Sequence, residues 1–176
     1  MTVTVRDAGS PDVPAVQAIY AHHVRTGAAT FELEAPPVEE MRRRWEGTVA
    51  AGLPYLVAVE GESVVGFAYC AAYRPRAAYR FTVEDSLYLD PAATGRGIGR
   101  RLLAELVARS ERAGHRQMVA VIGDSANEAS IALHRSLGFA EQGTLRGVGW
   151  KLGRWVDTVI LQRPLGAGLE RAPESP

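Results

Sequence analysis

Three glycines at alternate positions, Gly95, Gly97 and Gly99, form the chemically most informative segment of this 176-residue chain. An apolar run typical of a strand precedes them, and an amphipathic run typical of a helix follows. Glycine lets backbone N–H groups approach a ligand closely, and a helix N-terminus adds a partial positive charge. The segment therefore predicts a binding site for a polyanion such as a pyrophosphate.

The common nucleotide motifs do not fit this glycine segment. No G-x-x-x-x-G-K-[ST] sequence occurs, and G-x-G-x-x-G fails because Arg100 and Leu102 stand where its last glycine is required. A tight turn that needs glycine only for its backbone is the alternative. Arg96, Arg100 and Arg101 favour an anionic ligand, because a turn has no need of cations.

Two residues could carry protons. Alternation over residues 81–89 puts Glu84 in the middle of a predicted central strand, where a carboxylate is unusual unless it lines a cleft. Glu84 is therefore the first candidate for a general base, against the alternative of a buried acid paired with an arginine such as Arg80. His134 is the second candidate, since an ordinary imidazole pKa of about 6.5 suits proton transfer near neutrality. Its alternative is a helix-face histidine bound to a backbone carbonyl.

Other kinds of site find little support. His22 and His23 are adjacent on a predicted helix and point about 100° apart, so they are poor joint metal ligands, and we expect no metal. No G-x-S-x-G motif is present, which argues against a nucleophilic serine. Cys70, the only cysteine, lies in an apolar run and is expected to be a buried small side chain.

The elements that must position these residues follow from periodicity and from turn residues. Strands are predicted over residues 2–6, 55–60, 64–70, 81–89, 117–122, 141–145 and 158–162. Helices are predicted from Ser10, as N-cap, to Gly27, from Val38 to Ala50, from the glycines to about Ala113, and from a capping box at residues 125–128 to Gly138. The order β-α-α-β-β-β-α-β-α-β-β predicts a mixed α/β sheet with helices on both faces, and residues 83–122 are expected to join parallel strands.

Composition sets the broad class. Twenty basic and twenty acidic residues give a formal net charge of +0, so no global field favours nucleic acid or membrane as a partner. We expect one domain over residues 1–166, followed by a disordered polar tail at residues 167–176. No apolar stretch approaches the ~20 residues of a membrane span, and no signal-peptide pattern is seen, so a cytoplasmic location is the default expectation.

The chain resembles the GNAT superfamily of acyl-CoA N-acyltransferases. Thr94-Gly-Arg-Gly-Ile-Gly99 is similar to the family's [QR]-x-x-G-x-G/A pyrophosphate loop, with threonine at its first position. Residues 127–139 resemble a second family block, with His134 where many members carry tyrosine. The resemblance sharpens to the subgroup that acetylates phosphinothricin, methionine sulfoximine and methionine sulfone. The shared segments are residues 30–32, 76–80, 82–86, 118–123, 133–134 and 149–157.

This resemblance implies a largely antiparallel mixed sheet, acetyl-CoA as co-substrate, a small amino-acid-like acceptor, and a homodimer. It implies that the coenzyme contacts are Leu87, Tyr88 and Leu89 along the pantetheine arm, Gly95, Arg96, Gly97, Ile98, Gly99 and Arg100 around the pyrophosphate, and Asn127 and Ser136 on the later helix. Candidate acceptor contacts are Phe31, Arg74, Arg76, Arg80, Asp85 and Ser86, with a solvated arginine loop as the alternative for the three arginines.

Two rival functions remain. Related enzymes act on other small amines or on protein N-termini, but the arginine loop argues against cationic acceptors such as polyamines or aminoglycosides. A coenzyme-binding module without catalysis is the other rival, against which Glu84, Ser86 and His134 argue together. The block at residues 151–157 could shape the site or a dimer contact.

Overall fold

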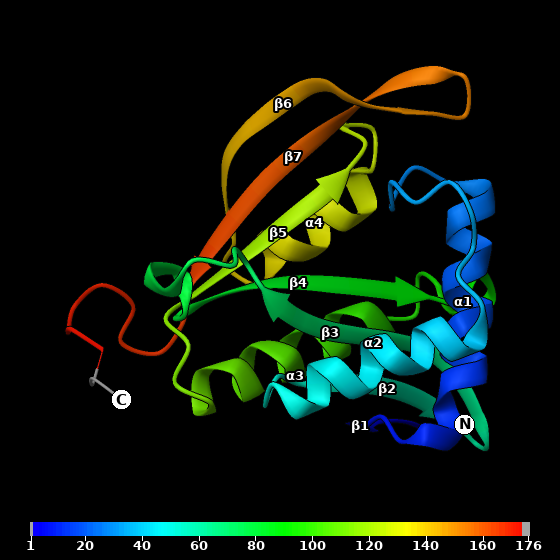
Figure 1. The fold of residues 1–176 in the computed structure, drawn as a ribbon, viewed down its shortest axis with the longest axis horizontal. Coiled ribbons are helices and arrows are strands. Elements are labelled where there is room, and N and C mark those ends of the chain that lie inside the picture. Colours follow the sequence, from blue (N-terminus) through cyan, green and yellow to red (C-terminus); the bar gives the residue numbers. More distant parts are fainter. Residues whose placement is uncertain (1, 174–176) are drawn as a thin grey trace.

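One seven-stranded sheet organises the computed structural model, which describes residues 2–173 (Figure 1). Its strand order is β1-β2-β3-β4-β5-β7-β6, and only β4 and β5 pair in parallel. The strands are β1 Val3–Asp7, β2 Tyr55–Glu60, β3 Ser63–Ala72, β4 Thr82–Leu89, β5 Gln117–Gly123, β6 Ala140–Lys151 and β7 Arg154–Pro164. The predicted order of elements and the mixed, largely antiparallel sheet are confirmed.

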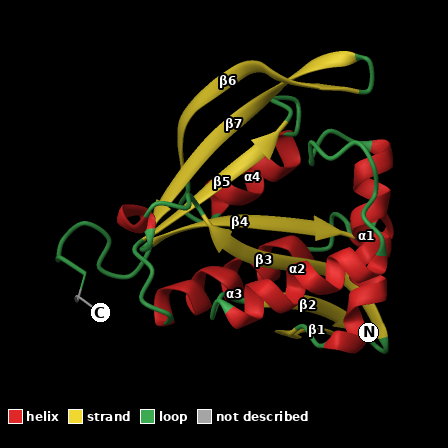
Figure 2. Cartoon of the chain, in the orientation of Figure 1, coloured by secondary structure: helices red, strands yellow, loops and turns green. Residues whose placement is uncertain are grey.

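Helices cover both faces of the sheet (Figure 2). They are α1 Val13–Thr26, α2 Val38–Ala50, α3 Ile98–Arg112 and α4 Glu128–Ser136. α1 and α2 pack with Phe67 of β3 in one apolar cluster, whereas α3 and α4 belong to a second cluster around Leu102, Leu106 and Met118. The apolar stripe predicted for α3 is thus its buried side. β4 contributes residues to both clusters and lies between them.

Two helix starts differ from the sequence prediction. Ser10 opens a short 3₁₀ turn and does not cap α1; the Asp12 carboxylate instead accepts the Gly9 N–H at 2.7 Å. For α4, Asn127 is the cap and accepts from the Ser130 N–H, whereas the Ser125 hydroxyl donates to Asp157. A local cap pattern was misread in both cases, because a distant or neighbouring carboxylate competes for the same groups.

The last hairpin is longer than predicted. β6 and β7 cover the 149–157 block except for the turn at residues 152–153, with irregular register between Glu141 and Gly143 and between Leu145 and Gly149. Glycines and charged residues hide the strand signal here, because pairing with a neighbouring strand, not local propensity, makes these segments extended.

The chain beyond β7 turns back on itself. Leu165 is buried, and the Gly168 N–H donates to its carbonyl oxygen. Disorder of residues 167–176 stays a prediction, and residues 174–176 lie outside the described part. Within residues 2–173, no helix combines the length and the apolar character needed to cross a bilayer.

Candidate active site

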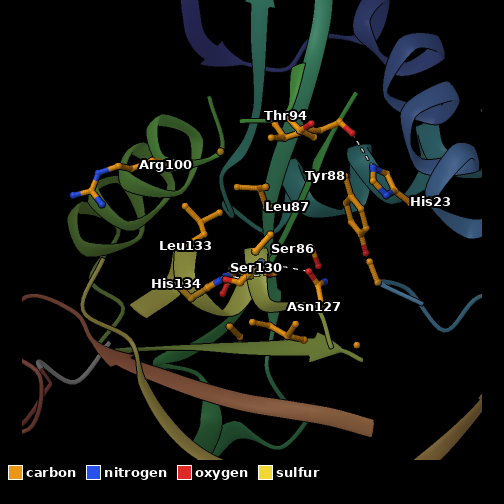
Figure 3. Close-up of a pocket in the computed structure, with 18 of the residues that line it drawn as sticks. His23, Ser86, Leu87, Tyr88, Thr94, Arg100, Asn127, Ser130, Leu133 and His134 are labelled. Carbon is orange, nitrogen blue, oxygen red and sulfur yellow. Dashed lines mark hydrogen bonds and ion pairs between the residues drawn. The ribbon is translucent and has the colours of Figure 1, made fainter. Parts of the chain in front are cut away.

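β4 and β5 separate halfway along their length, and the candidate site lies in the gap. They pair only from Thr82 opposite Gln117 to Asp85 opposite Ala120, and beyond this point they diverge (Figure 1). A cavity of about 410 Å³ fills the divergence. It is lined by Ser86, Leu87, Tyr88 and Leu89 of β4, Val121, Ile122 and Gly123 of β5, the glycine segment, and the cavity side of α4 (Figure 3).

The divergence leaves backbone groups of β4 free. The Asp90 N–H donates to Val65 and the Thr82 carbonyl accepts from Tyr73, so the even-numbered residues of β4 bond toward β3. Hydrogen-bonding groups alternate between the two edges of a strand, so the N–H and C=O of Leu87 and the N–H of Leu89 point into the cavity. The Leu89 carbonyl, on the same edge, contacts His23 Nε2 at 2.7 Å. This edge can pair with an extended ligand that carries amides.

The glycine segment forms the end wall of the cavity. Gly95 and Gly97 have φ of 71° and 75°, in the left-handed region that disfavours other residues, and Gly97 is the N-cap of α3. Apart from each glycine's own atoms and its chain neighbours, no atom of residues 2–173 lies within 4 Å of a Cβ built on either glycine. These glycines are therefore needed for their backbone conformation, and the open space in front of them leaves the helix N-terminus accessible to an anion.

The neighbouring basic and apolar residues of this segment lie in different places. Arg100 lines the cavity and donates to the Ser136 hydroxyl at 2.7 Å, which brings these two predicted coenzyme contacts together. Arg96 instead pairs with Glu60 at 2.5 Å, and Ile98 is buried in the core. Asn127 lines the cavity while its side-chain oxygen caps α4.

Glu84 lies on β4 beside the divergence, half-buried, on the same face as Ser86 and opposite to Asp85. Burial and the neighbouring charge of Asp85 raise the pKa of Glu84, and Arg74 opposes this rise. Among the described residues Glu84 has no salt-bridge partner, so the alternative of a carboxylate paired with Arg80 is not formed. A half-buried carboxylate with a raised pKa is suited to accept a proton.

His134 projects from α4 toward β4 and is 4% exposed. Its Nδ1 lies 2.7 Å from the Ser130 carbonyl oxygen, which is the backbone contact that the alternative interpretation of this histidine predicted. Its Nε2 lies 3.0 Å from Asp85 Oδ2. Burial alone would lower the pKa of His134, but the hydrogen bond and charge of Asp85 raise it overall. Asp85 is buried, and its Oδ1 has no hydrogen-bond partner within the described chain.

The three arginines predicted for the acceptor do not converge. Arg74 lies over the Tyr73 ring and is near enough for its charge to act on Glu84. Arg80 stacks on Phe81 at 4.5 Å and lines a separate hollow near the C-terminal end of α3. Arg76 is exposed at the start of a short 3₁₀ turn.

Phe31, on the loop between α1 and α2, lies against Gly149 of β6 and near Gly123 of β5. A Cβ on Gly149 would come within 2.5 Å of the Phe31 ring, and a Cβ on Gly123 would lie 2.2 Å from the Ala28 carbonyl oxygen. These glycines let the loop lie close to both strands. Phe31 thus lies where β5 and the hairpin meet, next to Gly123, which lines the cavity.

Sequence reasoning missed several contacts at this site. His23 was considered only as a metal ligand, yet it contacts the free edge of β4. In the 151–157 block, Lys151 donates to the Thr30 carbonyl, Arg154 pairs with Asp124, and Asp157 accepts from Ser125. Basic and acidic residues in a dense block were a signal of such contacts, but their partners are too distant in sequence to identify.

A family model and two curated relatives that match this chain are all acetyltransferases. The model of the acetyltransferase (GNAT) family matches residues 17–139. The chain is 54% identical over 171 residues to phosphinothricin N-acetyltransferase of Alcaligenes faecalis, covering 97% of this chain and 87% of that protein. It is 38% identical over 163 residues to an L-methionine sulfoximine/L-methionine sulfone acetyltransferase of Salmonella typhimurium, covering 93% and 95%.

A solved structure agrees with these sequence similarities. The phosphinothricin acetyltransferase of Sinorhizobium meliloti, in complex with AcCoA, superposes with a TM-score of 0.96 at 48% identity, covering 99% of this chain and 95% of that one.

Proposed function

This chain belongs to the GNAT acetyltransferase family, so it transfers an acetyl group from acetyl-CoA to an amine, and we propose that this amine is the α-amino group of a small amino-acid analogue. Phosphinothricin, methionine sulfoximine and methionine sulfone are the proposed acceptors, since relatives at 54% and 38% identity are named for them. Another small amine or a protein N-terminus is the alternative.

The free edge of β4 is the observation that supports the donor site. Bound acetyl-CoA supplies an acyl group activated as a thioester. Its pantetheine amides match the outward groups of Leu87 and Leu89, beside Tyr88, and its pyrophosphate matches the backbone of residues 95–100 at the N-terminus of α3. Asn127, Arg100 and Ser136 are proposed to bind the coenzyme from the far wall.

The position of Glu84 within range of the charge of Arg74 supports the acceptor site. An amino acid presents an ammonium and a carboxylate one carbon apart. Glu84 suits the ammonium and Arg74, whose charge acts on Glu84, suits the carboxylate. Ser86 shares the face of Glu84, and Phe31 and Tyr88 provide apolar walls. Arg76 and Arg80 lie on the same loop as Arg74 and are the less direct candidates.

The proposed reaction needs two proton transfers. Glu84 accepts the proton that the acceptor ammonium must lose, directly or through water, before the nitrogen lone pair can attack. The backbone N–H groups of Leu87 and Leu89 are positioned to polarise a carbonyl at the cavity edge. The carbon–sulfur bond then breaks, and the leaving thiolate takes a proton. His134 is the second proton carrier in the cavity wall.

A thiol-release assay tests the acceptor. Acetyl-CoA is offered with methionine sulfone, methionine sulfoximine, phosphinothricin, spermidine or a peptide. We expect turnover with the three amino-acid analogues. Turnover of only spermidine or the peptide would overturn the acceptor, and no turnover with any amine would favour a coenzyme-binding module without catalysis.

We also propose that the protein is a cytoplasmic homodimer that detoxifies such analogues, a class that includes a herbicide. β6 is an edge strand, and its hairpin with β7 exposes Leu145, Val148, Trp150, Leu152 and Trp155. An exposed apolar group of this kind is typical of a protein–protein contact. Sedimentation of the purified chain tests the dimer, and growth of expressing cells on phosphinothricin tests detoxification.

A further inference from the structure

Asp85 and His134 meet where the sheet divides. Asp85 is the last residue of β4 that pairs with β5, and His134 lies on α4 across the cavity wall. Their side chains are 2% and 5% exposed, and both line the cavity in which the reaction is proposed to occur. Figure 3 shows His134 in the wall of this cavity. The carboxylate, for which the sequence suggested an acceptor contact, is held by the imidazole.

Both ring nitrogens of His134 are occupied. A carbonyl oxygen can only accept, so the 2.7 Å contact with Ser130 requires a hydrogen on Nδ1. The 3.0 Å contact between Nε2 and Asp85 Oδ2 requires one hydrogen between these two atoms. Whether that hydrogen rests on nitrogen or on oxygen, no ring nitrogen keeps a lone pair that is free to accept another proton.

We infer that Asp85 is a positioning residue that occupies Nε2 of His134, so that the imidazole cannot take a proton from the acceptor amine and Glu84 alone serves as the general base. This inference rests on the proposed function. It removes the role of general base from His134.

The surroundings of the pair support this assignment. His134 packs edge-on against the Phe139 ring at 5.0 Å, and Asp85 is the only charged group within hydrogen-bonding distance of the imidazole within residues 2–173. Glu84 adjoins Asp85 in sequence but projects from the opposite face of β4, beside Arg74. The two proton-carrying sites are therefore separated by the strand itself.

The choice of variants depends on the buried Asp85 carboxylate, which has few hydrogen-bond partners. Asp85 Oδ1 has no partner among residues 2–173, so removal of His134 alone would leave a buried carboxylate without its hydrogen bond. Such a variant is at risk of misfolding. The double variant Asp85→Asn/His134→Gln removes the charge and the imidazole together and leaves two amides that can bond each other.

The first experiment compares pH profiles of kcat/KM for the wild type, Glu84→Gln and the double variant. We expect the double variant to keep the midpoint of the acid limb, although its rate falls, and Glu84→Gln to lose that limb. An acid limb that disappears in the double variant and persists in Glu84→Gln would overturn the inference, because His134 would then be the base.

The second experiment follows the His134 imidazole by NMR in the full-length wild type and in Asp85→Asn. The missing signal in the double variant identifies His134 among the four histidines. We expect its titration midpoint to lie above 6.5 in the wild type and to fall in Asp85→Asn. An unchanged midpoint would show that Asp85 does not hold the ring. This readout needs no acetyl transfer, so it separates failure of the pair from failure of the proposed function.

Discussion

Lys151 Nζ donates a 2.7 Å hydrogen bond to the carbonyl oxygen of Thr30, which lies 121 residues earlier in the chain. Lys151 is the only lysine of the protein and is 4% exposed. Burial lowers its pKa, and the charge of Glu32 opposes this change. The bond ties the β6–β7 hairpin to the loop that carries Phe31, next to the proposed acceptor side.

Replacing Lys151 with methionine keeps an unbranched apolar stem and removes the donor. We expect the free energy of unfolding to fall by about 1–3 kcal/mol, because a buried carbonyl loses its partner. We also expect a higher KM for the acceptor and little change in the KM for acetyl-CoA. Urea unfolding and steady-state kinetics measure these effects. Equal rises in both KM values would contradict the local role of this bond.

Gly149→Ala tests the position of Phe31. The new Cβ would lie 2.5–2.9 Å from three ring atoms, so the ring must move. Phe31 is 40% exposed and can rotate outward, so we expect the acceptor KM to rise several-fold with only a small change in melting temperature. Gly47→Ala in α2 is the matched control and should leave the KM unchanged, because no described atom beyond the chain neighbours and the helix backbone lies within 4 Å of the new Cβ.

Gly97→Ala separates backbone strain from steric contact. No described atom beyond the chain neighbours lies within 4 Å of the added Cβ, but φ is 75°, a conformation that costs an alanine roughly 1–2 kcal/mol. We expect weaker binding of acetyl-CoA by calorimetry, because the N-terminus of α3 would distort. Gly97→Asn should bind more tightly than Gly97→Ala, since asparagine tolerates this conformation better. The reverse order would show that strain is not the cause.

Glu84→Gln is expected to affect activity and stability in opposite directions. Loss of a general base typically lowers the rate about 10²–10⁴-fold. The pKa of Glu84 is raised in the folded protein, so the folded state favours the protonated carboxyl group over the carboxylate. The stability that this protonated group contributes is lost as the pH rises through the raised pKa. The variant should therefore melt at a higher temperature than the wild type at pH 7, with the difference disappearing below the ordinary pKa of 4.5.

Thermal unfolding at pH 4 and pH 7 measures this difference. A melting temperature for Glu84→Gln that is lower than that of the wild type at pH 7 would argue against a raised pKa. Glu62→Gln, in the exposed turn between β2 and β3, is a control outside the site.

Local signals in the sequence were enough for much of the fold. The bounds of α2 were predicted to the residue, and the order of all strands and helices was correct. Periodicity and turn residues act within one element, so they are visible without the partner elements. The caps of α1 and α4 were misread, because Asp12 and Asp157 compete for groups that a local pattern assigns elsewhere.

The length of the last hairpin escaped prediction for a related reason. β6 contains Gly143, Gly147 and Gly149, and it becomes a strand through its pairing with β7. Residues that are extended only because a neighbour pairs with them carry no pattern of their own.

The sequence by itself determined the conformation of the glycine segment, because Gly95, Gly97 and the start of α3 are neighbours in the chain and their backbone geometry is a local property. Only the tertiary structure decided how the proton carriers and cations are arranged. Asp85 reaches His134 across 49 residues, Lys151 reaches Thr30 across 121, and the arginines of one short loop point to different places. Contacts of this kind arise from the packing of separate elements, which spacing along a chain does not specify.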